Sequence, residues 1–392
     1  IHTGDFKLDP TPVVGEPFDP DLWAEVSKGG VRALVCDSTN IFSPDPGRSE
    51  QSIGPALETL VSEAQGMVVA TTFASNVARL KTLAEAGQRA GRSIVLLGRA
   101  MRRMVDAAQE TGVLPEFPAL VSAEAAQDIP RENLMLLVTG SQGERRAASA
   151  QLARGKYQGF ELKEGDMFLF SSKTIPGNEK SVARIINQLV ARGVRVIEDD
   201  SRYHVSGHAN RPDIAEVHRL TQPNLVVPMH GEYRHLAEHK ALAGANGFKA
   251  ALAPNGRMID LSDNPGAEVE DIATGRLYQD GSVLIGARDG IVRERLRMAM
   301  RGLVSVSVVI DENNRPLEGV WAEPQGLADP RRGELSVAIE QALETALARA
   351  APKDIQSDSN PEDLIARICR KTCQDLIGKK PLVKVLINRL SD

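Results

Sequence analysis

The sequence has few aromatic residues, few cysteines and no excess of basic charge, and each shortage argues against a class of protein. Aromatic residues make up 4% of the 392 positions, so base stacking on aromatic platforms is not expected to dominate recognition. The formal net charge of -5 argues against a general basic coat for nucleic acid, although a local basic cleft is compatible with it. Cys36, Cys369 and Cys373 are too scattered for a disulfide framework, so a reducing, cytoplasmic setting is expected.

Long apolar runs are also missing. No run reaches the ~18 apolar residues that cross a membrane, and no signal peptide is visible, so no membrane association is expected. The chain begins at Ile1 rather than at a methionine, inside what reads as the end of a strand. We therefore expect an N-terminally truncated piece of a longer protein.

What the sequence does contain is an alternation of short apolar runs and amphipathic stretches. The runs are rich in β-branched residues and are bounded by Gly, Ser, Asp or Asn, which is typical of buried parallel strands. They lie at 31–37, 66–73, 93–98, 134–140, 166–172, 194–199 and 224–231. Helical patterns at 76–91 and 179–193 lie between them. The alternation predicts an α/β fold with helices on both sheet faces and with function at the carboxyl ends of the strands.

The pattern changes near residue 263, where a polar, turn-rich stretch begins. The elements expected beyond it are a β-hairpin at 302–321, helices at 333–350 and 361–377, a loop at 351–363 and a closing strand at 381–390. Together they predict a small α+β domain of roughly 100 residues, a common size for a domain.

Polar residues suited to catalysis follow several of the expected strands. Asp5 and Asp37 each end an apparent strand, where a carboxylate can bind a metal or orient a metal-bound water. Each is a weak signal by itself, because a strand-end Asp is often a turn residue or a helix cap. Two histidine-containing motifs, HVSGHA at 204–209 and PMHGEYRH at 228–235, add side chains that can bind metal or phosphate.

Six motifs occur in order along the chain: HTGDFKLDPTP, DSTN, TGSQGE, SSKTIPGNEKSV, HVSGHA and PMHGEYRHL. Together they resemble the ribonuclease J family, bacterial members of the metallo-β-lactamase superfamily that carry a β-CASP insertion. The resemblance runs from residue 1 through about 285 and extends more loosely to the tail. Six motifs in order are much more specific than any one of them.

The resemblance implies a partial metallo-β-lactamase αββα sandwich, an inserted β-CASP α/β domain and a small C-terminal α+β domain. Residues 1–45 and 201–285 would form the metallo-β-lactamase part, 46–200 the β-CASP domain and 286–392 the C-terminal domain. An RNA channel would run between the first two domains, and the third would support oligomerisation.

The resemblance also implies a two-zinc nuclease acting on RNA, with roles that transfer position by position. Asp5 of HTGD would bridge both zinc ions, and His230 of HGE would bind one of them. Asp37 would orient metal ligands or take part in proton transfer, and His208 of SGHA would face the scissile phosphate. The residue types fit, because zinc accepts imidazole nitrogen and carboxylate oxygen, and an uncoordinated histidine can protonate a leaving oxygen.

Contacts to RNA phosphates are expected from two Gly-containing loops, whose backbone N–H groups can cradle an anion, and from an arginine beside HGE. The residues are His204, Ser206, Gly207, Ser141, Gln142 and Arg234. GSQGE lacks the Gly-Lys-Ser/Thr of a nucleotide-binding P-loop, so ATP binding is not predicted. A plain strand-to-helix turn is the alternative interpretation of GSQGE and of SSKTIPGNE.

The other histidines and cysteines favour structural roles. His235 and His239 are four residues apart, as a zinc pair on a helix would be, but packing or exposure to solvent is the favoured interpretation. His218 is expected on a helix surface. Cys369 and Cys373 are expected to be reduced and to pack in a core.

The superfamily's main ligand box, His-x-His-x-Asp-His, is absent from this sequence. We expect it upstream of HTGD, so the isolated chain would bind zinc poorly and show little activity. The resemblance further implies 5′-to-3′ exonuclease activity on RNA with a 5′-monophosphate, some endonuclease activity, homodimers or homotetramers, and a place in RNA maturation and decay. Two alternatives stay open: a non-catalytic RNA-binding or assembly subunit of an RNA-degradation complex, and a β-CASP nuclease that cuts DNA.

Overall fold

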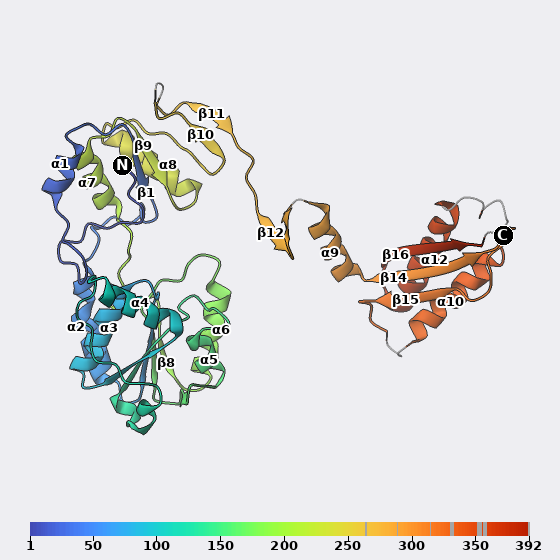
Figure 1. Ribbon diagram of the computed structural model, residues 1–392, viewed down its shortest axis with the longest axis horizontal. Coiled ribbons are helices and arrows are strands. Elements are labelled where there is room, and N and C mark those ends of the chain that lie inside the picture. The colour runs from blue at the N-terminus through green and yellow to red at the C-terminus, as the bar shows by residue number, and fades with distance from the viewer. Residues whose placement is uncertain are drawn as a thin grey trace. The chain divides into compact units, whose positions relative to one another are not determined.

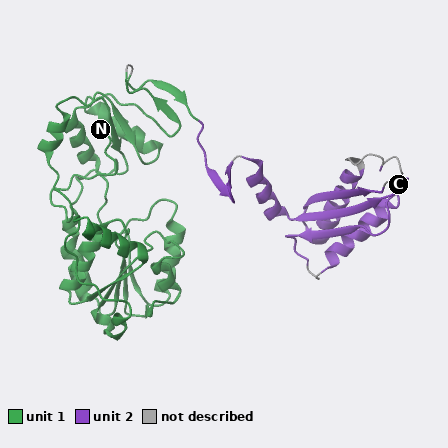
Figure 2. Cartoon of the chain, viewed as in Figure 1, with its two compact units in different colours: residues 1–272 green, residues 273–392 purple. Residues whose placement is uncertain are grey.

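The computed structural model describes residues 1–262, 265–287, 289–313, 315–329, 333–350, 355 and 359–390. The chain divides into two compact units, Ile1–Ile272 and Ala273–Asp392 (Figure 2). The division falls within the polar, turn-rich stretch that was expected to end the α/β region. Each unit has apolar cores of its own, so each is described by itself.

The largest element of the first unit is a five-stranded parallel sheet in the order β3-β4-β2-β7-β8. Its strands are β2 (Val68–Thr71), β3 (Ser93–Leu97), β4 (Leu134–Val138), β7 (Met167–Phe170) and β8 (Arg195–Ile197). Every residue of β2, β4 and β7 is buried, as expected for strands that are covered on both faces.

Helices cover both faces of this sheet (Figure 1). They are α2 (Gly54–Glu63), α3 (Val77–Arg89) and α4 (Arg99–Glu110) on one face, and α5 (Ala148–Arg154) and α6 (Glu179–Val190) on the other. Successive strand residues point to opposite faces, so Val68 packs with the first set of helices and Val69 with the second. The predicted α/β class is therefore confirmed.

A second, smaller part of the first unit holds β1 (Leu34–Asp37) and β9 (Val226–Met229), which pair in parallel. Its helices are α1 (Pro20–Ser27), α7 (Arg211–Thr221) and α8 (Tyr233–Ala245). Leu34 of β1 packs with Val217 of α7 and Leu242 of α8 in one buried cluster. Because the pairing is parallel and in register, the carboxyl ends of β1 and β9 lie side by side.

The remaining elements of the first unit are short. They are 3-10 helices at Glu50–Ile53, Ala125–Asp128 and Arg131–Asn133, and antiparallel pairs β5 (Lys156–Tyr157) with β6 (Phe160–Glu161) and β10 (Arg257–Ile259) with β11 (Glu268–Asp271). None of the helices in the described ranges is both long and apolar enough to cross a membrane.

The second unit is built on a three-stranded sheet in the order β15-β14-β16. Its elements are β12 (Leu277–Asp280), β13 (Val283–Gly286), α9 (Gly290–Arg301), β14 (Leu303–Ile310), β15 (Trp321–Gln325), α10 (Glu334–Leu347), α12 (Ser359–Ile377) and β16 (Leu382–Arg389). Alternate residues of β14 are buried, together with Cys369 and Cys373 of α12. The predicted hairpin, helices, closing strand and packed cysteines are confirmed. The predicted loop at 351–363 extends too far, because α12 begins at Ser359, and residues 351–354 and 356–358 lie outside the described residues.

Candidate functional site

Side chains that were predicted from the sequence to bind metal or to act in catalysis lie together at the carboxyl ends of β1 and β9. Asp37 is the last residue of β1, and His230 follows directly after β9. The segment that carries Asp5 is held beside β1 by a parallel bridge between His2 and Val35. His230 Nδ1 lies 3.0 Å from Asp5 Oδ1 and 3.4 Å from Asp37 Oδ1. The predicted meeting of Asp5 and His230 is therefore observed.

His208 enters the same site from the loop before α7. Its Nδ1 atom lies 2.6 Å from Asp37 Oδ2 and 4.0 Å from Asp5 Oδ1. Burial alone would raise the pKa of Asp37, but hydrogen bonds from His208 and Thr39 outweigh it and hold that pKa below its usual range. In return, the hydrogen bond to Asp37 raises the pKa of His208. The pair therefore favours an ionised carboxylate facing an imidazole that gains a proton readily.

The HGE turn has a backbone that few residue types adopt. His230 and Gly231 have φ values of 63° and 78°, in the left-handed region. A Cβ added at Gly231 would meet the His235 ring at 2.8 Å, so this position requires glycine. His235 Nδ1 in turn accepts a 3.0 Å hydrogen bond from Glu232 N and caps the start of α8. His235 thus packs against neighbours, as the favoured interpretation expected.

Asn40, in the DSTN motif, fixes the SGHA loop around His208. Its Nδ2 atom donates to Ser206 Oγ at 2.9 Å, to the His208 carbonyl at 3.2 Å and to Asn210 Oδ1 at 3.0 Å. Ser206 Oγ also accepts from His208 N at 3.1 Å, while Gly207 is exposed. This role of Asn40 was not predicted from the DSTN motif, although an amide that follows a strand end is a possible hydrogen-bond donor.

Arg79 of α3 supports the same loop, a role that was not predicted from the sequence. The side chain is fully buried and forms an ion pair with Glu50. Its Nη1 atom lies 2.9 Å from His204 Nδ1, and its Nη2 atom donates to the Val205 carbonyl at 3.1 Å. Burial, followed by the charge of Arg79, lowers the pKa of His204 to about 4. His204 is therefore a neutral side chain held in place by Arg79.

A cavity of about 420 Å³ lies beside His208. It is lined by polar groups from both parts of the first unit, among them Asn40, Lys173, His204, Ser206 and His208. Lys173 and Arg48 bring positive charge to its wall, and Asp45, Asp199 and Asp200 bring negative charge. An extended ligand bound in this cavity would reach the side chains at the ends of β1 and β9.

Three of the predicted phosphate contacts lie elsewhere. Ser141 and Gln142 are buried and do not line this cavity in the described structure. The side chain of Gln142 donates to the Lys173 carbonyl at 3.0 Å and accepts from Ile175 N at 2.8 Å, so it ties the loop after β4 to the loop after β7. Arg234 is exposed, and its guanidinium lies 5.6 Å from the centre of the Phe42 ring.

A second group of possible ligands, Cys36, His218 and His239, is buried beneath the site. The prediction that His218 lies on a helix surface is wrong: it occupies the face of α7 that turns Ile214 and Val217 into the core. This spacing of three and four residues was the signal that indicated a core position.

The geometry of this buried group fits packing better than metal binding. The Nε2 atoms of His218 and His239 lie 3.0 Å apart, so a hydrogen bond between them occupies the lone pair that an ion would need. Ser38 Oγ lies 2.8 Å from His239 Nδ1. Burial lowers the pKa of His218 to about 4 and that of His239 to about 3, and it raises the pKa of the Cys36 thiol. All three groups are therefore neutral near pH 7.

Asp5, Asp37 and His230 are the better metal donors. Their ligand atoms all lie within 4.8 Å of one another, and carboxylate oxygen with imidazole nitrogen suits zinc. The side chains of Asp5 and His230 are 65% and 41% exposed, so solvent and substrate reach them. These residues fit part of a zinc site, and further ligands would have to complete it.

Three family models match successive parts of the chain. "Ribonuclease J, beta-CASP domain" matches residues 65–189, "Zn-dependent metallo-hydrolase RNA specificity domain" matches 193–254, and "Ribonuclease J C-terminal domain" matches 290–390. The second of these matches contains the SGHA loop and the HGE turn. The matches thus include His208 and His230 of the site and most of the second unit, whereas Asp5 and Asp37 precede the matched ranges.

Curated relatives resemble the chain along most or all of its length. A protein named Ribonuclease J from Sinorhizobium meliloti is 35% identical over 399 residues, which cover 100% of this chain and 70% of the relative. Proteins of the same name from Corynebacterium glutamicum and Mycolicibacterium smegmatis are each 32% identical, with 95% and 98% of this chain covered. The chain spans 52% and 69% of the lengths of those two relatives.

Proposed function

Because this chain belongs to the ribonuclease J family of nucleases, we propose that it carries part of the active site of a zinc-dependent enzyme that cleaves RNA. Since the chain spans 70% of one relative and 52% of another, the activity is proposed for the protein that contains these residues. We expect 5′-to-3′ exonuclease activity on RNA with a 5′-monophosphate, with some endonuclease activity. Two zinc ions, a homodimer or homotetramer, a cytoplasmic setting and a role in RNA maturation and decay belong to the same proposal.

The observation that carries the proposal is the convergence of Asp5, Asp37, His208 and His230 on one place. Asp5 and His230 are positioned to hold metal. Zinc bound there would neutralise phosphate charge and activate water. The Nδ1 atom of His208 is hydrogen-bonded to Asp37. The other ring nitrogen, Nε2, is therefore the one that can donate a proton to the leaving oxygen. Asp37 thus acts on the reaction by orienting His208.

Substrate phosphates would bind in the cavity beside His208. Ser206 and Lys173 offer donors there, and His204 offers its second ring nitrogen. Gly207 is exposed in the same loop and remains a candidate phosphate contact. Arg234 remains a candidate at the exposed end of the site. For Ser141 and Gln142 we propose an indirect role, because Gln142 holds the loop that presents Lys173.

The test uses RNA and DNA strands of the same sequence, each with a 5′-phosphate, and follows product length over time. Release of mononucleotides from RNA is expected, and chelation followed by addition of zinc should abolish and then restore it. Cleavage of DNA at an equal or greater rate would support the DNA nuclease instead. Binding of RNA without cleavage at any zinc concentration would support the non-catalytic subunit.

A further inference from the structure

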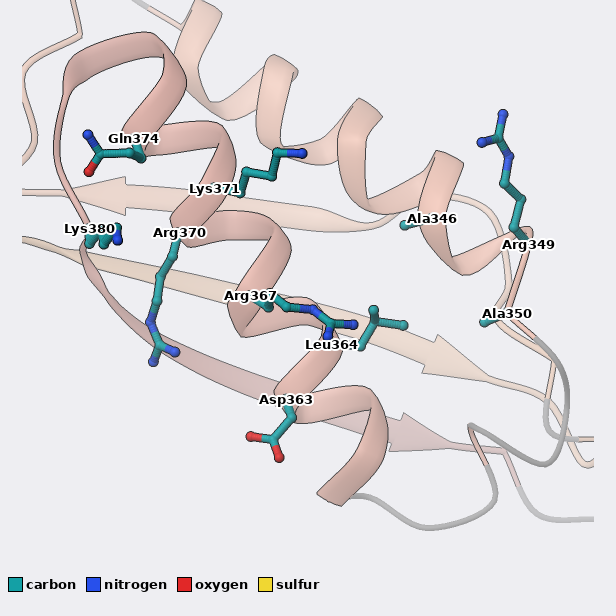
Figure 3. A pocket seen from close by; sticks show the side chains of 10 residues that line it. All are labelled: Ala346, Arg349, Ala350, Asp363, Leu364, Arg367, Arg370, Lys371, Gln374 and Lys380. Carbon is teal, nitrogen blue, oxygen red and sulfur yellow. The ribbon is translucent and has the colours of Figure 1, made fainter.

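The second unit has a broad groove beside α12 that is lined by cations. Arg367, Arg370, Lys371 and Gln374 recur at intervals of three and four residues, so they project from successive turns of the helix (Figure 3). Lys380 joins them from the connection to β16. The groove has a volume of about 1010 Å³ and extends to the end of α10.

Cations outnumber carboxylates among the described residues that line this groove. Five of its lining side chains are cations, with Arg349 at the end of α10 as the fifth, and Asp363 is the one acidic residue among them. In the ranges that the structure describes, no salt bridge joins any of the five to a carboxylate. By contrast, Arg295 of the same unit is bound to Asp280 at 2.7 Å.

This concentration of charge runs against the composition of the chain. The chain has 52 acidic residues against 47 Lys and Arg. Side chains with like charge repel when they project from neighbouring turns of a helix, and this repulsion opposes folding. A cluster of exposed cations that form no salt bridges is typical of a surface that binds an anion.

The residue types indicate which anion. Guanidinium groups bind phosphate through paired N–H donors, and three of the five cations are arginines. None of the described residues that line the groove is aromatic, so they offer no platform for base stacking. The spread of charge over several turns of α12 fits a run of phosphates better than a single one, because each contact can then meet a different phosphate.

We propose that this groove binds the sugar-phosphate backbone of single-stranded RNA without regard to sequence. The proposal deepens the proposed function and rests on it for the choice of RNA as the polyanion. The groove would hold substrate through the second unit, whereas the cleavage residues all belong to the first unit. Its loss is therefore expected to weaken RNA binding without removing any cleavage residue.

The experiment measures binding alone, so it stays separate from the question of cleavage. Fluorescence anisotropy of a 5′-labelled, mixed-sequence single-stranded RNA is followed in EDTA, with the full chain, between 50 and 200 mM KCl. The variant R367Q/R370Q/K371Q removes three cations. If each meets one phosphate, the slope of log Kd against log salt should fall by about 2, and affinity at 50 mM KCl should fall at least tenfold.

A matched control removes three exposed cations of the same unit that lie outside the groove, R293Q/R297Q/K384Q. The Kd of this control variant for RNA should stay within about twofold of the wild-type Kd, because charges that contact no phosphate contribute little to binding. The charge-preserving variant R367K/R370K should keep the wild-type slope and will show whether the groove, rather than the fold, was altered. Wild-type affinity and slope in R367Q/R370Q/K371Q would overturn the proposal, as would an equal loss in the control. A loss confined to the groove variant would support it even if the protein cleaved no RNA.

Discussion

The Nδ1 atom of His208 donates a 2.6 Å hydrogen bond to Asp37 Oδ2, although the two residues are 171 positions apart. Asp37 is buried, whereas His208 is partly open to the cavity beside it. This pair joins the end of β1 to the SGHA loop. It fixes the orientation of the imidazole ring, and the other ring nitrogen, Nε2, takes no part in this bond.

Replacing His208 should slow cleavage while leaving fold and metal in place. His208→Ala removes the proposed proton donor, so single-turnover cleavage of RNA by the protein that contains this chain should slow by roughly 10²–10⁴. Zinc content, measured by elemental analysis, and the thermal midpoint should stay close to wild type. A wild-type cleavage rate would remove His208 from the mechanism.

Replacing His230 should act on the metal instead. His230→Ala removes an imidazole donor that lies 3.0 Å from Asp5, so zinc content should fall and cleavage should be abolished. Lys240→Ala is the matched control, because Lys240 lies on the exposed side of the adjoining helix α8 and should retain zinc. Unchanged zinc stoichiometry in His230→Ala would refute its assignment as a ligand.

Arg79 should matter for stability. Arg79→Met leaves the buried carboxylate of Glu50 without its cation, a change that costs about 3–5 kcal/mol in the free energy of unfolding. Arg89→Met, on the same helix, removes an arginine that is half exposed and should cost less than about 1 kcal/mol. Urea midpoints of the two variants give the comparison, and equal midpoints would contradict the assigned role.

The buried pair of His218 and His239 predicts a loss of stability in acid. Burial lowers the pKa of His218 to about 4 and that of His239 to about 3, whereas both titrate near 6.5 when unfolded. The unfolded chain therefore binds protons first as the pH falls, and stability should drop from pH 6.5 down to about 4.

The measurement is the urea midpoint of the full chain at several pH values in that range. The double variant His218→Leu/His239→Leu removes both buried imidazoles, so its midpoint should depend less steeply on pH. An identical pH dependence in wild type and variant would show that other groups cause the acid sensitivity.

Local patterns were enough to predict the elements that carry the site. The apolar runs at 66–73 and 166–172 became β2 and β7 because a strand buried on both faces needs apolar residues throughout. The family resemblance of the ordered motifs implied that Asp5 and His230 lie together, and their side chains are 3.0 Å apart.

Contacts between distant segments could not be predicted in this way. Arg79 reads as an exposed helix residue until the fold brings Glu50 and His204 to it, from 29 and 125 positions away. The expectation of a surface position for His218 was wrong, because its spacing from Ile214 and Val217 puts it on the buried face of α7. At this position the periodicity of the helix is a better guide to burial than the polarity of the side chain.

The three hydrogen bonds of Asn40 carry a consequence for how this site can diverge. One amide nitrogen serves the Ser206 hydroxyl, the His208 carbonyl and the Asn210 amide at once. A substitution of Asn40 would remove the donor for several acceptors at once. We therefore expect it to be tolerated only together with compensating changes at positions 206 and 210. Residues 40, 206 and 210 should therefore covary among homologues of this chain, and an alignment of many homologous sequences would test this.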